Sequence, residues 1–295
     1  MIRPFSALLL VLIGCSAPFA ADLKVDRDVV YGKAGDVELM ADIYTPAETS
    51  AEPLPVVLLV HGGGWRGGNR QAGAEVALAH HLVPHGYVAV SISYRLVGRD
   101  AEGKLVNQWP AAIDDCRQAV RWIRENAEKL NIDPSRMGAA GDSAGGHLVS
   151  LLGTTDVAAS GETSTRVQAV VNIYGPADLR DKATADAISG NPAVKQMVDE
   201  FVGEGPTQAK IDASPLLHID DQTVPILTFQ GAKDALVPYQ QSVAFDAALR
   251  KAGRDSKLVM YENEGHGFSG PTFRKMLLET RNFFDKHLKP EDANN

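Results

Sequence analysis

The feature that most constrains the fold is a regular alternation of apolar strands and amphipathic helices. Six short runs have the continuous hydrophobicity expected of strands that are covered on both faces: Val56–Val60, Val88–Tyr94, Met137–Gly141, Val167–Tyr174, Ile226–Gln230 and Lys257–Tyr261. Between and after them lie segments with helical periodicity: Gln71–Pro84, Pro110–Leu130, Ser143–Gly153, Gln240–Ala252 and Pro271–His287. This alternation predicts a mostly parallel sheet with helices on both faces.

Two further strands and one insertion complete the predicted architecture. A glycine-containing turn separates two further predicted strands, Asp28–Tyr31 and Val37–Tyr44, which predicts an antiparallel hairpin. With this hairpin at its edge, the predicted sheet has eight strands. Gly175–Thr223 has no buried strand and carries charged residues and prolines, which predicts a small cap-like insertion with short helices around Ala193–Phe201. We therefore expect a single α/β domain over residues 22–295.

The composition narrows the range of functions. The chain has 295 residues and 44% hydrophobic residues, enough for a substantial core. Its net charge of −8 and its lack of Lys/Arg clusters argue against a nucleic-acid partner. The two cysteines cannot form a disulfide scaffold, and no Cys/His set has zinc-site spacing. The closely spaced His80, His81 and His85 are interpreted as a solvated helix end, so neither a metal nor a cofactor is expected.

The N-terminus has the pattern of an export signal. Met1–Ala21 combines the positive Arg3, an apolar stretch and a small-residue end, and the apolar stretch is too short to span a bilayer. Leu12–Cys15 is similar to the lipobox of bacterial lipoproteins, in which the cysteine is lipidated; the alternative is ordinary cleavage near Ala21. We favour the lipoprotein signal, which would make Cys15 the only membrane attachment. A lipoprotein signal and an ordinary cleaved signal both predict a periplasmic or extracellular protein.

A nucleophilic serine is indicated by Gly141-Asp142-Ser143-Ala144-Gly145, which fits the pattern G-x-S-x-G. The pattern lies between a predicted strand and a predicted helix, the context in which a strained turn exposes the serine hydroxyl. Small residues are needed because the backbone packs closely around such a turn. The alternative, a turn with a capping serine, is disfavoured by this context. Ser143 is therefore the predicted nucleophile.

A second motif, His61-Gly62-Gly63-Gly64-Trp65, directly follows the strand Val56–Val60. Consecutive glycines leave backbone N–H groups free to point at a ligand oxygen, as in an oxyanion hole. The predicted donors are Gly63 and Gly64, joined by Ala144 after the nucleophile. Trp65 is a candidate for substrate contact, whereas His61 is expected to make structural hydrogen bonds.

A serine nucleophile needs a base that is oriented by an acid, in the chain order serine, acid, histidine for this type of fold. His266 lies in a glycine-flanked loop after the last predicted strand, whereas His147 and His287 lie within predicted helices and His218 within the insertion. Asp234 follows the strand Ile226–Gln230, at the end of the sheet where α/β folds place their chemistry. Ser143, His266 and Asp234 are therefore the predicted catalytic set.

These motifs together resemble the α/β-hydrolase superfamily. The sequences HGGGW, GDSAGG, Lys233-Asp234 and Gly265-His266-Gly267 look like those of esterases related to hormone-sensitive lipase and of the bacterial acetyl/feruloyl esterase-like group. The resemblance covers Asp28–Leu288 and implies an α/β-hydrolase fold with a serine esterase activity. Residues 22–55 lack the amphipathic helix of an N-terminal cap, which favours the smaller acetyl/feruloyl esterase-like branch.

We therefore expect a serine carboxylesterase that acts on short-chain acyl esters, including acetyl or feruloyl groups on carbohydrates. Its partners would be small-molecule or carbohydrate ester substrates. The alternatives are an arylformamidase-like or other small-amide hydrolase, a lipase, and a non-catalytic hydrolase-fold binding protein. A lipase is disfavoured because Gly175–Thr223 is polar for a lipid-facing lid. A binding protein is disfavoured because all three members of the catalytic set are present.

Overall fold

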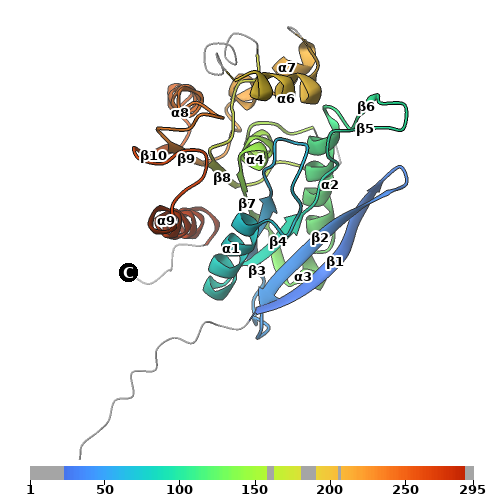
Figure 1. Ribbon diagram of the computed structural model, residues 1–295. Coiled ribbons are helices and arrows are strands. Elements are labelled where there is room, and N and C mark those ends of the chain that lie inside the picture. Colours follow the sequence, from blue (N-terminus) through green and yellow to red (C-terminus); the bar gives the residue numbers. More distant parts are fainter. Residues whose placement is uncertain (1–22, 158–162, 181–190, 205–206, 290–295) are drawn as a thin grey trace, which may run out of the picture.

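The computed structural model describes residues 23–157, 163–180, 191–204 and 207–289 (Figure 1). An eight-stranded sheet forms the centre, in the order β1-β2-β4-β3-β7-β8-β9-β10. The strands are β1 (Leu23–Ala34), β2 (Val37–Pro46), β3 (Leu54–Val60), β4 (Val88–Ile92), β7 (Ile132–Asp142), β8 (Ala169–Ile173), β9 (Ile226–Gly231) and β10 (Ser256–Tyr261). The six strands β4, β3, β7, β8, β9 and β10 are mutually parallel. β1 and β2 add an antiparallel edge. The predicted eight-stranded, mostly parallel sheet is confirmed.

Helices cover both faces of this sheet. They are α1 (Gly73–Leu82), α2 (Ala111–Glu125), α3 (Ala127–Leu130), α4 (Ala144–Thr154), α8 (Gln240–Lys251) and α9 (Gly270–Leu288), with a 3₁₀ turn η1 (Val83–His85) after α1. Alternate residues of β3 point to opposite faces: Leu58 belongs to the apolar cluster that includes side chains of α2, α4 and α8, whereas Leu59 belongs to the cluster that includes side chains of α1 and α9. Both faces of the central strands are therefore buried, as their continuous apolar sequences predict.

The element boundaries depart from the predictions at three places. The predicted helix Pro110–Leu130 is broken at Asn126 into α2 and α3. A two-stranded hairpin, β5 (Gly98–Arg99) and β6 (Leu105–Val106), was not predicted because its strands are too short to show a period. β1 begins earlier than expected because most of its side chains are at least partly exposed, so hydrophobicity does not mark its start.

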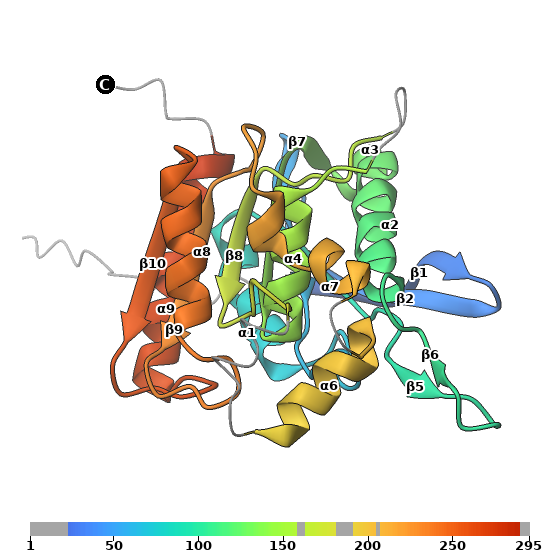
Figure 2. The ribbon, with the colours of Figure 1, turned by 90° about the horizontal axis from the view of Figure 1, so that it is seen from above.

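The insertion Gly175–Thr223 contains α6 (Pro192–Val202), α7 (Gln208–Asp212) and the 3₁₀ turn η2 (Pro215–His218). Figures 1 and 2 show α6 and α7 beside one end of α4, near the carboxyl ends of the parallel strands. The inner side of α6 buries Val194, Val198 and Phe201, whereas Lys195 on the same helix is exposed. The segment is therefore polar in composition but apolar on the side that faces the sheet.

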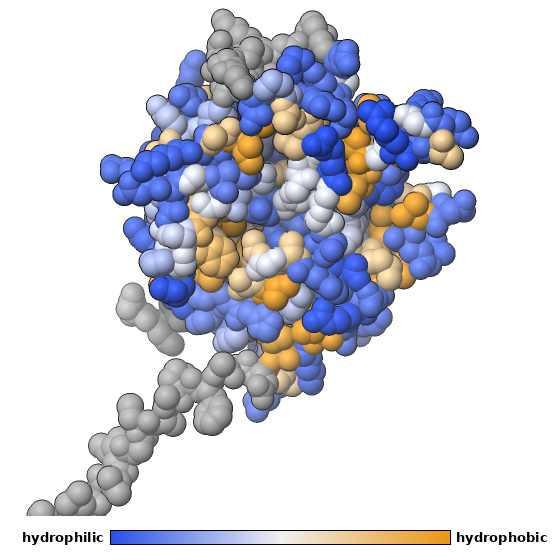
Figure 3. Space-filling model, viewed as in Figure 1, coloured by the Kyte–Doolittle hydropathy of each residue, from blue (hydrophilic) through white to orange (hydrophobic). Residues whose placement is uncertain are grey.

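The predicted signal segment Met1–Ala21, including Cys15, lies outside the described residues. Within the part of the chain that is described, no helix has the length and apolar character needed to cross a membrane. Figure 3 shows apolar side chains dispersed among hydrophilic ones on the face of Figure 1.

Candidate active site

Ser143 lies in the sharp turn between β7 and α4, with the unusual backbone angles φ 50° and ψ −117°. Its backbone N–H donates a hydrogen bond of 2.8 Å to the carbonyl of Ile173 in the neighbouring strand β8. The turn requires glycine two residues later, because a Cβ on Gly145 would lie 1.9 Å from the carbonyl oxygen of Val60. The local structure thus matches the strained turn that the G-x-S-x-G pattern predicts.

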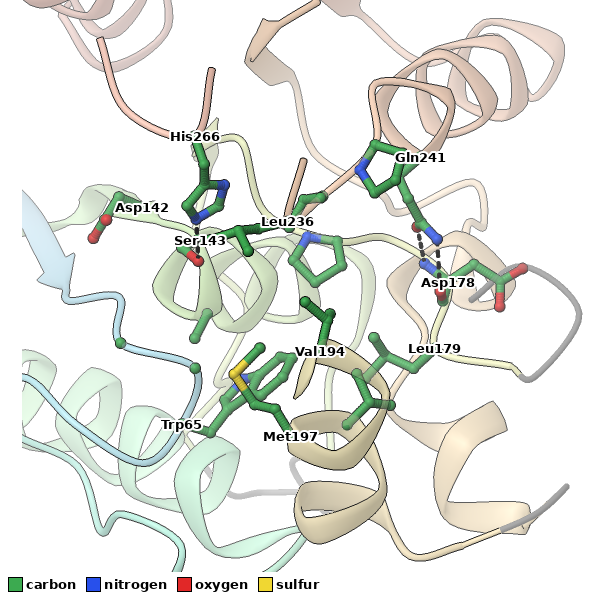
Figure 4. Close-up of a pocket in the computed structure, with 17 residues that line it drawn as sticks. Trp65, Asp142, Ser143, Asp178, Leu179, Val194, Met197, Leu236, Gln241 and His266 are labelled. Carbon is green, nitrogen blue, oxygen red and sulfur yellow. Dashed lines mark hydrogen bonds between the residues drawn. The ribbon is translucent and has the colours of Figure 1, made fainter. Parts of the chain in front are cut away.

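The structure brings the three residues of the predicted catalytic set into one hydrogen-bonded chain. Ser143 Oγ lies 2.8 Å from His266 Nε2, and His266 Nδ1 lies 2.8 Å from Asp234 Oδ2. The dashed line in Figure 4 marks the first of these bonds at the rim of a pocket. The side chain of Asp234 is fully buried, whereas that of His266 is 18% exposed. A neutral imidazole with its proton on Nδ1 fits both contacts, leaving Nε2 to accept the serine proton.

Asp234 is held rigidly in the loop after β9. Its Oδ1 accepts hydrogen bonds of 2.8 Å from the backbone N–H groups of Leu236 and Val237. Its Oδ2, the oxygen that faces His266, also accepts a bond from the side-chain amide of Gln230. These donors fix the orientation of the carboxylate toward His266.

The predicted oxyanion donors line the same cavity as Ser143 and His266. Gly63 and Gly64 have φ angles of 105° and 60°, which side-chain-bearing residues rarely adopt. Among the described residues, the N–H groups of Gly63, Gly64 and Ala144 donate to no protein acceptor. The N–H of Ala144 also lies at the first turn of α4, where the helix dipole favours negative charge. Three unpaired donors therefore remain for a substrate oxygen.

Trp65 lines the cavity but is only 2% exposed, because it stacks on Phe201 of α6 with ring centroids 4.3 Å apart. Its indole N–H donates to Nδ1 of His147 at 3.3 Å, and His147 Nε2 lies 2.6 Å from the carbonyl of Ala213. Complete burial lowers the pKa of His147 to about 4, so the ring is neutral. His147 therefore ties α4 to the HGGGW loop and to the insertion.

His61 also has the structural role predicted for it. Its ring is buried, its Nδ1 lies 2.7 Å from the carbonyl of Gly62, and it stacks on Tyr94 with centroids 4.3 Å apart. Burial lowers the pKa of His61, which keeps the ring neutral. His81 and His85 lie near one another at the end of α1, with their ring centroids 5.3 Å apart. Within the described residues, no group of three or more His, Cys, Asp or Glu side chains is arranged to hold a metal ion.

The cavity at Ser143 has a volume of about 330 Å³ and is mainly apolar (Figure 4). Sequence reasoning missed most of its walls, which come from the insertion, from the loop after β9 and from the start of α8: Pro176, Asp178, Leu179, Val194, Met197, Val198, Leu236, Val237, Pro238 and Gln241. The helical spacing of Val194, Met197 and Val198 was the available signal, since these residues share one face of α6. Their direction toward Ser143 depends on tertiary packing.

Comparison with known proteins agrees with this geometry. A profile of the BD-FAE family matches residues 41–249, more than half of the chain. The chain belongs to the BD-FAE family. Among curated proteins, Esterase LipC of Mycobacterium tuberculosis is 30% identical over 85% of this chain and 64% of its own length. LipM of the same organism, a probable carboxylic ester hydrolase, is 32% identical over 79% of this chain and 53% of its own length. The chain thus spans between half and two thirds of these two relatives.

Several solved structures match this chain over nearly the whole of their own length. Esterase 2 of Thermogutta terrifontis, phosphonylated by sarin, has a TM-score of 0.76 and 26% identity, covering 93% of this chain and 99% of that protein. Other structures of the same esterase hold propionate or butyrate. The acetyl ester-xyloside bifunctional hydrolase of Caldicellulosiruptor lactoaceticus has a TM-score of 0.69 and 25% identity, covering 85% and 89% of the two chains. The fold of this chain is that of the α/β-hydrolase esterases.

Proposed function

We propose that this protein is a serine carboxylesterase that hydrolyses short-chain acyl esters. The observation that carries the proposal is the hydrogen-bonded chain from Ser143 through His266 to the buried carboxylate of Asp234. A serine hydroxyl becomes an effective nucleophile when a base accepts its proton and an acid orients that base. Ser143 and His266 line one apolar cavity, where an ester carbonyl can approach Ser143.

The chemistry runs through an acyl-enzyme. Ser143 Oγ attacks the ester carbonyl carbon while its proton passes to His266 Nε2, and Asp234 stabilises the imidazolium that forms. His266 then gives this proton to the leaving alkoxide, so that the C–O bond breaks and the acyl group stays on Ser143. Water attacks the acyl-enzyme with His266 again accepting a proton, and that proton returns to Ser143 Oγ as the acid leaves.

The oxyanion formed in both steps would be bound by the N–H groups of Gly63, Gly64 and Ala144. Their lack of any other acceptor among the described residues supports this assignment. Each such donor typically contributes about 3 kcal/mol to stabilisation of the transition state.

The size of the cavity favours small acyl groups. Its volume of about 330 Å³ lies at the low end of the range for ligand pockets, roughly 300 to 1,000 Å³. Propionate and butyrate are bound by a structural relative, and another relative is named for acetyl esters and xylosides. By analogy with these proteins, acetyl or feruloyl groups on carbohydrates are the proposed natural substrates.

The test is hydrolysis of a series of p-nitrophenyl esters from acetate to palmitate, alongside acetylated xylo-oligosaccharides and methyl ferulate. We expect the highest kcat/KM for acetate to butyrate, and complete loss of turnover in Ser143→Ala. A preference for palmitate would indicate a lipase. Failure to cleave any ester, with cleavage of N-formylkynurenine, would indicate the small-amide hydrolase and overturn the proposal.

We further propose, from the N-terminal sequence alone, that the protein is exported and carries a lipid on Cys15. Mass spectrometry of the mature protein, produced in a bacterium that processes lipoproteins, tests this. A lipidated N-terminal Cys15, lost in Cys15→Ser, is the expected result. An unmodified N-terminus near Ala21 would support ordinary cleavage, and an intact Met1 would contradict export.

A further inference from the structure

Two acidic side chains, Glu75 and Asp142, lie next to the oxyanion loop, and the proposed mechanism does not use them. Glu75 is on α1 and is 0% exposed, and Asp142 directly precedes Ser143. No N–H or O–H group of the described residues donates a hydrogen bond to either carboxyl oxygen of Glu75. The neighbouring acidic side chain is that of Asp142, whose carboxyl group faces the carboxyl group of Glu75. Two carboxyl groups can form a hydrogen bond only when one of them keeps its proton.

Burial and the nearby charge of Asp142 identify the group that keeps the proton. They raise the pKa of Glu75 to about 9, so its carboxyl group is neutral in ordinary buffers. The partner carboxyl group of Asp142 accepts, at Oδ1, a hydrogen bond of 2.7 Å from the backbone N–H of Gly62. Burial and the nearby charge of the same carboxyl group raise the pKa of the Tyr174 hydroxyl.

Asp142 therefore lies between two groups whose positions matter for catalysis, the oxyanion loop and the ring of Tyr174. Gly62 immediately precedes the oxyanion donors Gly63 and Gly64, and Tyr174 contacts the His266 ring with centroids 4.7 Å apart. Figure 4 shows the Asp142 carboxylate directed away from the Ser143 hydroxyl, so it is a positioning group and not a second base. A Cβ on Gly62 would lie 2.7 Å from Asp142 Oδ2, which shows how closely the carboxylate packs on the loop.

We propose that Glu75 is a positioning residue that donates its proton in a hydrogen bond to Asp142, so that one negative charge holds Gly62 and the oxyanion loop in place. Loss of that proton would put two repelling carboxylates behind the loop, where they oppose the negative charge of the transition state. The inference rests on the proposed esterase function, and it predicts an alkaline limit to the activity.

The other titratable groups around the pair do not supply a compensating positive charge. Tyr174 follows β8, Tyr94 follows β4 and His61 opens the HGGGW loop. Burial raises the pKa of Tyr174 and of Tyr94 and lowers the pKa of His61, so all three are neutral near pH 7. In the described part of the chain, neither Glu75 nor Asp142 forms an ion pair with a lysine or arginine.

The first test compares Glu75→Gln with Glu75→Leu in the full-length protein. Glutamine keeps a hydrogen-bond donor to Asp142 and cannot ionise, whereas leucine removes the donor. Hydrolysis of ethyl butyrate is followed in a pH-stat from about pH 6 to pH 10. We expect kcat of the wild type to fall above about pH 9, the Glu75→Gln variant to lack this fall, and Glu75→Leu to lose about tenfold at every pH. Parallel pH profiles of the wild type and Glu75→Gln would overturn the proposal.

The second test does not depend on activity. An unfolded glutamate ionises near pH 4.5, so folding must keep a proton on Glu75 at higher pH, and stability falls as pH rises from about 4.5 to about 9. The Tm of Glu75→Gln should therefore rise relative to the wild type across this window, while the exposed control Glu128→Gln follows the wild type. A constant Tm difference would overturn the proposal, even for a protein that hydrolyses no ester.

Discussion

Met197 of α6 lies directly over Gly64 of the oxyanion loop, since a Cβ on Gly64 would be 2.0 Å from Met197 Sδ. A residue of the insertion thus closes the cavity beside a predicted oxyanion donor, and Figure 4 shows its thioether next to the indole of Trp65. Because an unbranched thioether fills this space, Met197 sets the room available to the acyl chain on this side.

Replacing Met197 with alanine should therefore extend the accepted acyl chain. One added methylene in an apolar pocket changes kcat/KM by about tenfold or more, so the ratio of octanoate to butyrate hydrolysis should rise about tenfold in Met197→Ala. The matched control is Gln196→Ala, on the exposed side of the same helix. An unchanged ratio in Met197→Ala would mean that the acyl chain lies elsewhere in the cavity.

The orienting role of Asp234 has its own test. In Asp234→Asn the amide oxygen can still accept from Leu236 and Val237, so the fold should be retained. The amide would favour the wrong tautomer of His266, and kcat should fall by about 10⁴-fold. The exposed control Asp221→Asn should keep wild-type kcat. A loss of less than about tenfold in Asp234→Asn would reassign the acid of the triad.

The predicted parts of the fold and site are those with a local sequence signal. Continuous apolar runs marked the central strands, and the glycine patterns around Ser143 and Gly63 marked turns that only small residues allow. His266 and Asp234 were predicted from their loops after strands, because parallel strands bring their carboxyl ends to one edge of the sheet.

The parts that were missed depend on contacts between distant segments. The polar composition of the insertion concealed the apolar side of α6, which becomes a cavity wall only because it packs against Trp65. Glu75 resembles an ordinary helix carboxylate in the sequence, and its partner Asp142 follows it 67 positions later. Burial of such a pair cannot be deduced from local periodicity.

The backbone of Ser143 predicts a difference between two inactive variants. Its φ of 50° is strained for any residue with a side chain, so Ser143→Gly should be more stable than Ser143→Ala by about 1 kcal/mol in urea unfolding. At the control position Ser150, inside α4, the order should reverse, because glycine in a helix costs about 1 kcal/mol relative to alanine. Equal stability of the two Ser143 variants would contradict stored strain at the turn.

The buried, neutral ring of His147 predicts acid sensitivity of the fold. Its folded pKa of about 4 lies below the value of 6.5 in an unfolded chain, so unfolding takes up a proton and stability decreases as pH falls through this window. Between about pH 7 and pH 4.5 the wild type should lose about 2 kcal/mol more free energy of unfolding than His147→Gln. The partly exposed control His218→Gln should follow the wild type. Equal acid sensitivity of the wild type and His147→Gln would mean that His147 accepts a proton in the folded state. The hydrogen bond that the Trp65 indole N–H donates to Nδ1 of His147 opposes such protonation.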